Sequence, residues 1–149
     1  MKHKLNILSI FLATIGSMMV GFLWYDVLFP DLWRDITGIN PDEHVEEWFF
    51  ALASSFLSSI VVAVFLSWFL SRTDCSSAWR GRLYDVIEGI KGGLIIAIFC
   101  IGATIWPNYA FEYRKFAHFL LHVGEMTLAL VVMGVIIGMM RGPQKGSML

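Results

Sequence analysis

Four long apolar stretches, separated by short polar segments, constrain this chain more than any other feature of its sequence. They cover residues 5–25, 48–70, 86–106 and 116–140. About 20 mainly apolar helical residues cross a hydrocarbon core about 30 Å thick, and each stretch is long enough to do so. Only 15% of the residues are charged, against about 25% in soluble proteins. We therefore predict an all-α, polytopic transmembrane four-helix bundle that forms one domain over residues 1–149.

The basic residues predict how the helices are oriented, because Lys and Arg in short loops are retained on the cytoplasmic side. One side would hold the two termini and the second connection, with Lys2, Lys4, Arg72, Arg80, Arg82, Lys91, Arg141 and Lys145. The other side would hold Arg34, Arg114 and Lys115. Both termini are therefore expected in the cytoplasm. The polar segment 72–85, with Trp79 and Leu83 interspersed, fits a short interfacial helix on that side.

Several functional classes find no support in the sequence. The net charge is −1 and no basic residues cluster, so nucleic-acid binding is not expected. Cys75 and Cys100 lie far apart and lack the spacing of metal ligands. No Ser/His/Asp set, phosphate-binding loop or dinucleotide fingerprint is present. We therefore name no catalytic residue and expect no cofactor, and we regard an enzyme as the less favoured class.

The fourth stretch carries ionisable side chains at membrane depth, where a charge is expensive and marks a candidate functional site. His118, His122 and Glu125 project within an arc of roughly 60° on one helix face. Three interpretations remain open. The residues could bind Zn²⁺ with a ligand from elsewhere, they could relay protons, or they could only hydrogen-bond to one another and to neighbouring hydroxyls.

Small residues predict where helices approach one another, because membrane helices associate through close van der Waals contact. In the second helix these are Ser54, Ser55, Ser58 and Ser59. The fourth helix carries Gly134 and Gly138 at four-residue spacing, which suits either a dimer face or a contact within the chain. We expect membrane lipid and further copies of the chain, in a homo-oligomer, as partners.

An aromatic signature begins within the end of the first apolar stretch and continues beyond it. It consists of Gly21, Trp24, Tyr25, Phe29, Trp33 and Gly38. Together with Glu112, Arg114 and Gly124 in the last hairpin, it resembles the domain-of-unknown-function 1761 family of small bacterial and archaeal membrane proteins. The resemblance implies a multi-pass protein of the cytoplasmic membrane, with no established activity to transfer. This chain departs from the family pattern at His122 and Glu125, where Asn and Tyr would be expected.

The signature has two interpretations. Trp24 and Tyr25 suit an interfacial anchor, with the segment from Phe29 to Trp33 lying along the membrane surface. The alternative is a lipid-binding or re-entrant cleft beneath these rings.

The leading functional hypothesis is a packing or interaction module without enzymatic activity. The second is a small transporter or channel with a polar seam along His118, His122 and Glu125, and the third is a membrane enzyme acting on lipid. The sequence does not identify a small-molecule or ion substrate.

Overall fold

The computed structural model describes residues 6–39, 45–72 and 81–141, and every regular element within these ranges is helical. In chain order the elements are α1 (Ile7–Phe22), the π-helix η1 (Leu23–Leu28), α2 (Pro30–Thr37), α3 (Val45–Arg72), α4 (Gly81–Ile95), the π-helix η3 (Ile96–Gly102), α5 (Ala103–Phe111) and α6 (Phe116–Met139). Asn6 caps α1 by accepting hydrogen bonds from the backbone N–H groups of Leu8 and Ser9, as expected of an N-cap residue.

Four helical segments within the described residues are long and apolar enough to cross a membrane, as the sequence predicted. They are Ile7–Leu28, Glu47–Arg72, Arg82–Phe111 and Phe116–Met139, and each has a mean hydropathy of 1.9 or more. Many of their large apolar side chains, such as Phe50 and Phe99, are exposed. This arrangement suits a chain surrounded by lipid tails, since a water-soluble protein rarely exposes so much contiguous apolar surface.

The third span is longer than the sequence suggested. The predicted end at residue 106 is wrong, because the helix continues through Pro107 to Phe111. Proline is tolerated in a membrane helix when a local π-helix and hydroxyl side chains satisfy the carbonyl groups that it leaves free. Here η3 directly precedes α5. The Thr104 hydroxyl donates to the carbonyl groups of Cys100 and Ile101, which lie before Ala103, the residue whose carbonyl Pro107 leaves without its usual donor.

The same span also begins earlier than expected. Gly81 already starts α4, so residues 81–85 belong to this long helix and not to a separate interfacial helix. Residues 73–80, which the predicted interfacial helix would also include, lie outside the described residues. Within α4, Lys91 Nζ lies 2.9 Å from Glu88 Oε1, so these two opposite charges compensate each other near the helix start.

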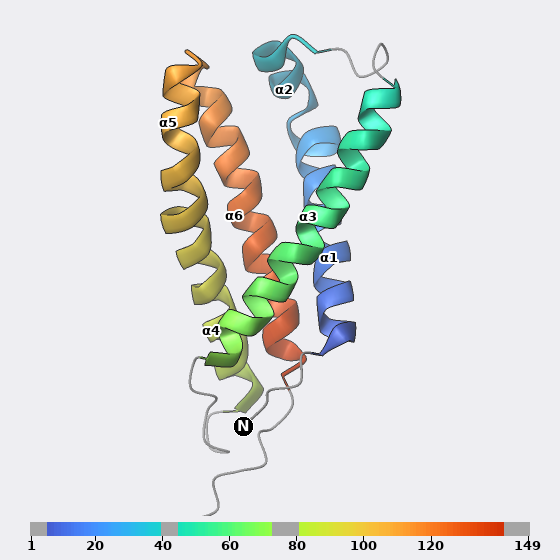
Figure 1. Cartoon of the computed structure of the whole chain (residues 1–149), viewed down its shortest axis with the longest axis vertical. Coiled ribbons are helices and arrows are strands. Elements are labelled where there is room, and N and C mark those ends of the chain that lie inside the picture. The colour runs from blue at the N-terminus through green and yellow to red at the C-terminus, as the bar shows by residue number, and fades with distance from the viewer. Residues whose placement is uncertain (1–5, 40–44, 73–80, 142–149) are drawn as a thin grey trace, which may run out of the picture.

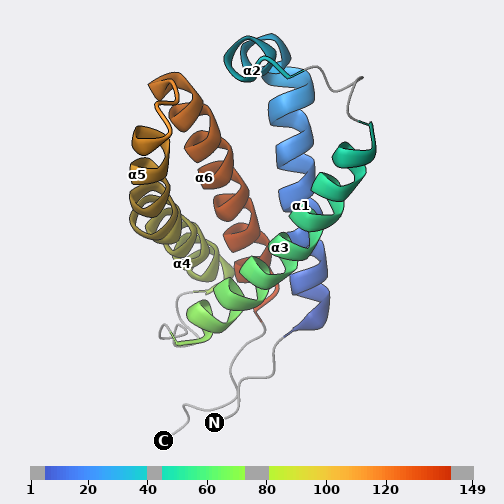
Figure 2. The same cartoon turned by 45° about the horizontal axis from the view of Figure 1, so that its top comes forward.

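The helix α6 lies in the middle of the fold (Figure 1), with α1 along one side and α4 along the other. Helix α3 crosses this layer obliquely and contacts α1, α4 and α6. Its upper half diverges from α5 and α6, while α2 turns across the upper end of α1 (Figure 2). We call the end of the molecule at which α2 lies its upper end.

The apolar core lies mainly in the lower half of the molecule. It is formed by Ile10, Ala13, Ala63, Leu66, Leu70, Ile96, Ala97, Leu130, Met133 and Ile137. These residues come from the beginning of α1, the later part of α3, the beginning of η3 and the later part of α6. The earlier part of α3 has no share in this core, so the helices are less tightly joined in the upper half.

Glycine allows α4 and α6 to touch backbone to backbone. A Cβ atom on Gly134 would overlap the backbone of Gly89, and one on Gly138 would overlap the backbone of Asp85. A Cβ on Gly93 would likewise lie 2.5 Å from the Leu130 carbonyl oxygen. Of the two roles that the sequence allowed for Gly134 and Gly138, the structure has the contact within the chain. Such close approach is how small residues hold membrane helices together.

The serine-rich face of α3 contacts another helix at one of its four positions. The Ser59 hydroxyl lies 3.4 Å from that of Ser17 on α1. Ser54, Ser55 and Ser58 are exposed, and the Ser54 hydroxyl donates to the Ala51 carbonyl of its own helix. In the isolated chain, three of these serines therefore form surface and not an interhelical contact.

Candidate functional site

The π-helix η1 carries the first half of the aromatic signature against α6. Its wide turn is closed by the Phe29 N–H, which donates to the Trp24 carbonyl over 2.9 Å. The indole Nε1 of Trp24 donates to the Leu121 carbonyl on α6 over 3.1 Å. Single π-helical turns inside α-helices often occur at functional sites. Trp24 is thus bonded to a neighbouring helix, in addition to any role at the membrane interface.

The next residue, Tyr25, meets the polar face of α6. Its hydroxyl lies 3.3 Å from His122 Nδ1, and the tautomer of the imidazole decides which of the two donates. The Trp33 ring of α2 packs against the Tyr25 ring with 6.5 Å between the centroids, in an edge-on arrangement. Side chains from α2 and from the distant helix α6 therefore meet at the Tyr25 side chain.

Tyr109 of α5 packs against the two histidines on this face of α6. This side chain is 9% exposed. Its ring lies edge-on to the His118 ring at 5.1 Å and stacks with the His122 ring at 6.3 Å. The Arg114 guanidinium lies over the outer side of Tyr109, 5.2 Å from the ring centroid, and also pairs with Glu112. Nothing in the sequence distinguishes Tyr109, because a tyrosine near the end of a span also fits an interfacial belt.

Glu125 lies deeper in the same face of α6 and is half-buried. One carboxylate oxygen lies beside Gly21 of α1, 3.6 Å from the position that a Cβ atom there would occupy. Within the described residues, Glu125 has no hydrogen bond or ion pair. A methyl group at Gly21 would therefore just touch an acidic group whose charge no described residue pairs with. We refer to Tyr25, Tyr109, His118, His122 and Glu125 as the polar cluster.

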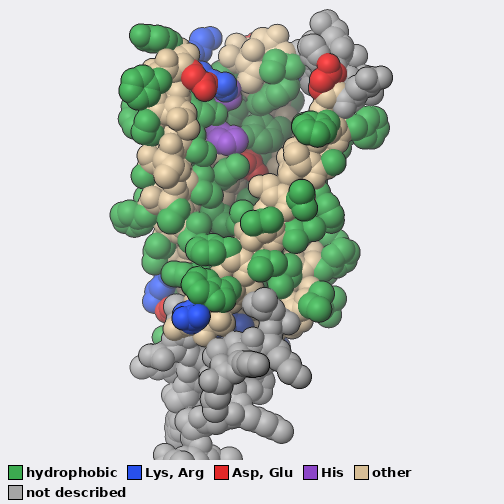
Figure 3. Space-filling model, viewed as in Figure 1, with side chains coloured by type: hydrophobic (Ala, Val, Ile, Leu, Met, Phe, Trp, Pro, Cys, Tyr) green, Lys and Arg blue, Asp and Glu red, His purple; other side chains and the backbone are tan. Residues whose placement is uncertain are grey.

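Part of this cluster is open to the outside. The space-filling view has a hollow in the upper half, between α3 and the column formed by α5 and α6, with histidine and acidic side chains inside it (Figure 3). His118, His122 and Glu125 are each neither buried nor fully exposed. The cluster is thus reachable from the side on which α3 diverges.

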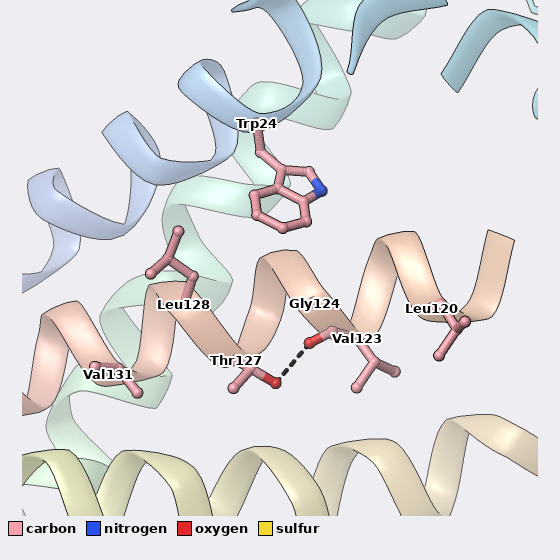
Figure 4. Close-up of a pocket in the computed structure, with 7 residues that line it drawn as sticks. All are labelled: Trp24, Leu120, Val123, Gly124, Thr127, Leu128 and Val131. Carbon is pink, nitrogen blue, oxygen red and sulfur yellow. Dashed lines mark hydrogen bonds between the residues drawn. The ribbon is translucent and has the colours of Figure 1, made fainter. Parts of the chain in front are cut away.

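The opposite face of α6 is apolar. A groove of about 480 Å³ lies under the Trp24 ring (Figure 4), lined by Trp24, Leu120, Val123, Gly124, Thr127, Leu128 and Val131. A Cβ on Gly124 would lie 3.1 Å from the indole, so glycine lets the ring lie close to the helix. The Thr127 hydroxyl donates to the Val123 carbonyl over 2.6 Å. The polar cluster and this groove therefore occupy different faces of one helix.

Two further signature residues shape the connection after η1. Phe29 packs on Trp24 with 4.8 Å between the ring centroids. Gly38 ends α2 in the left-handed conformation, with φ of 68°, and its N–H donates to the Arg34 carbonyl over 2.8 Å. Glycine is the usual residue at such a C-cap, because it lacks the Cβ that strains this conformation.

The geometry gives the metal interpretation no support. Among the described residues, no three His, Cys, Asp or Glu side chains are placed to hold one metal ion. Tyr25 contacts an imidazole nitrogen of His122, and the rings of both histidines pack against Tyr109. The arrangement gathers two phenols, two imidazoles and a carboxylate, all of which can carry a proton, and among the described residues one hydrogen bond joins two of them, Tyr25 and His122.

Comparison with known proteins identifies the family. The family described as "Protein of unknown function (DUF1761)" matches residues 8–138, which include the aromatic signature, the polar cluster and the glycine contact between α4 and α6. No curated protein and no solved structure matches the chain. The chain therefore belongs to the domain-of-unknown-function 1761 family, as the signature around Trp24 and Tyr25 suggested.

Proposed function

We propose that this protein is a multi-pass four-helix bundle of a bacterial or archaeal cytoplasmic membrane, with both termini in the cytoplasm. The basic residues support this orientation. A second support is that the Asn6 side-chain amide donates to the Met140 carbonyl over 3.4 Å, so the beginning of α1 and the end of α6 lie at the same end of the molecule. The upper end, with α2 and the hairpin between α5 and α6, then faces outward.

Cysteine labelling tests this orientation. In a background with Cys75 and Cys100 replaced by serine, Asp35→Cys should react with a membrane-impermeant maleimide in intact cells. Lys145→Cys should react only after the cells are permeabilised. The reverse pattern contradicts the orientation and leaves the fold unaffected.

We further propose that the protein is a small transporter whose polar cluster takes up and releases protons within the membrane. The observation that supports this most directly is the uncompensated Glu125 carboxylate beside the Tyr25–His122 contact. A charged side chain at the bilayer centre costs about 2.5–3.5 kcal/mol on insertion scales, so such groups in membrane helices are typically functional. A purely structural role would more often pair the carboxylate with a hydrogen-bond donor.

Proton flux into liposomes tests the role of Glu125. The purified full chain would be reconstituted with a pH-sensitive dye inside, and a pH gradient imposed across the membrane. We expect Glu125→Gln to reduce the flux to the level of empty liposomes. Glu88→Gln is the matched control, because Glu88 pairs with Lys91 and belongs to α4. Equal flux through wild-type protein and Glu125→Gln, or no flux through either, contradicts the proposal.

A packing or interaction module is the second candidate, and a specific observation favours it. Ser54, Ser55 and Ser58 form an exposed strip of small residues on the diverging half of α3. Serine-lined surfaces let membrane helices approach closely, so a second copy of the chain could pack there. Cross-linking of Ser55→Cys in the membrane tests this homo-oligomer: a dimer band is expected, and only monomer contradicts it.

A further inference from the structure

We propose that the hollow at the polar cluster binds a lipophilic organic cation, with Glu125 as its counter-ion. This inference rests on the proposed function, because it names the class of substrate that the same site would exchange for a proton. The charge of the site, its shape and its access each support the inference.

The charge of the site favours a cation. Glu125 has no ion-pair partner within the described residues. In the hairpin between α5 and α6, Arg114 already pairs with Glu112 and lies over the Tyr109 ring. The other titratable groups of the cluster are the phenols of Tyr25 and Tyr109 and the imidazoles of His118 and His122. A carboxylate without an ion-pair partner, in a medium of low dielectric constant, is strongly stabilised by a positively charged ligand.

The shape of the site favours an organic cation over a metal ion. No three potential metal ligands converge among the described residues. Instead, the aromatic side chains Tyr25 of η1 and Tyr109 of α5 contact His122, which precedes Glu125 on the same face of α6, and Gly21 contributes no side chain beside the carboxylate. Aromatic rings attract ammonium-type cations through their negative faces, and this attraction is strongest where water is excluded.

Access to the site favours a ligand that dissolves in lipid. The hollow opens sideways, between the diverging half of α3 and the column of α5 and α6 (Figure 3). The diverging half of α3 carries exposed apolar side chains, including Trp48, Phe49 and Phe56. A ligand that enters this way passes through the hydrocarbon region before it meets Glu125, and a small hydrophilic cation would not do so.

A proton and a cation would compete for the same carboxylate. Binding of the cation requires the ionised form of Glu125, whereas a proton neutralises it. We therefore expect the affinity for the cation to fall as the pH is lowered. The other groups that face Glu125 from η1, α5 and α6 are the tyrosines and histidines of the polar cluster. The phenols are neutral when protonated, whereas protonation of the two imidazoles would add positive charge and oppose the cation in the same direction.

Equilibrium dialysis of the purified full chain in detergent tests the inference. The probe is tetraphenylphosphonium, and tetraphenylborate serves as an anion of nearly the same size and shape. We expect saturable binding of the phosphonium and none of the borate. Glu125→Gln should weaken phosphonium binding about thirtyfold or more, since removing one partner of a buried charge pair costs about 2 kcal/mol or more. The control Glu88→Gln should bind as the wild type does.

A second variant keeps the test decisive if Glu125→Gln folds poorly. Gly21→Leu leaves the carboxylate in place and fills the space beside it, so it should also abolish phosphonium binding. Equal binding by the wild type and by either folded variant, or equal binding of the borate, overturns the inference.

Comparison with the flux experiment separates the two proposals. Binding of the phosphonium that depends on Glu125, without proton flux, supports the ligand class and removes the proton relay. Proton flux that depends on Glu125, without phosphonium binding, supports the relay and removes the ligand class.

Discussion

The Tyr25 hydroxyl of η1 and the His122 Nδ1 atom of α6 lie 3.3 Å apart. Tyr25 belongs to the aromatic signature at the end of the first apolar stretch, and His122 belongs to the ionisable face of the fourth. In sequence these two features are separate. Their contact makes one site of them and places it at a π-helical turn, which is a frequent feature of functional sites.

A double-mutant cycle measures this contact. We expect Tyr25→Phe and His122→Phe to show a coupling free energy of about 0.6 kcal/mol, the average found for hydrogen bonds between membrane helices. Unfolding in mixed micelles supplies the free energies of unfolding. The pair Tyr25→Phe and His118→Phe is the control, because His118 packs on Tyr109. If both cycles give the same coupling, the contact contributes nothing specific.

The glycine contact between α4 and α6 predicts a strong effect of a single methyl group. Gly134→Ala should lower the free energy of unfolding by about 1–3 kcal/mol, because its Cβ would overlap the backbone of Gly89. Gly102→Ala is the matched control. Its Cβ would lie 3.4 Å from the nearest atom, so we expect a change within about 0.5 kcal/mol. Similar losses for the two variants would show that α4 and α6 are not in this close contact.

The Trp24 indole predicts a difference between two tryptophan variants. Trp24→Phe removes the hydrogen bond to the Leu121 carbonyl and should lower the melting temperature of the purified protein. The missing hydrogen bond should lower the free energy of unfolding by about 0.5–1.5 kcal/mol, in addition to the effect of the smaller ring. Trp106 makes ring contacts with Phe116 and Phe119 and is half-exposed. Trp106→Phe should therefore be milder, and an equal or larger effect there would argue against the bond.

Gly38 predicts a conformational effect without any loss of contact. A Cβ at this position would meet no atom within 4 Å, yet its positive φ disfavours other residues. Gly38→Ala should cost about 1–2 kcal/mol. Gly38→Asn should cost less, because asparagine tolerates the left-handed conformation better. Thermal unfolding of the two variants checks this, and equal stability of Gly38→Ala and wild type would contradict it.

The four membrane-crossing segments could be predicted because length and apolarity act locally along the chain. Their exact extent could not. Proline in a helix interior usually ends or kinks the helix, yet the helix continues through Pro107 directly after the π-helix η3. Glu88 and Lys91 likewise suggest a weak start to this span, whereas the helix begins before them, at Gly81, and their charges pair.

The candidate site could be predicted in part. His118, His122 and Glu125 share a helix face, which spacing alone indicates. Their partners come from other helices, and no local pattern in one sequence says that Tyr109 faces α6 or that Gly21 lies beside Glu125. The strip at Ser54, Ser55 and Ser58 illustrates the converse, since small residues predict close packing and these three lie exposed in the isolated chain.

In the proposed function, Glu125 takes up and releases a proton within the membrane. Infrared difference spectroscopy of the protein in lipid, recorded while the pH is changed, observes the carbonyl band of a protonated carboxyl group directly. We predict a band that appears on acidification in the wild type and in Glu88→Gln, and that is missing from Glu125→Gln. A wild-type spectrum that matches that of Glu125→Gln at every pH would contradict the account.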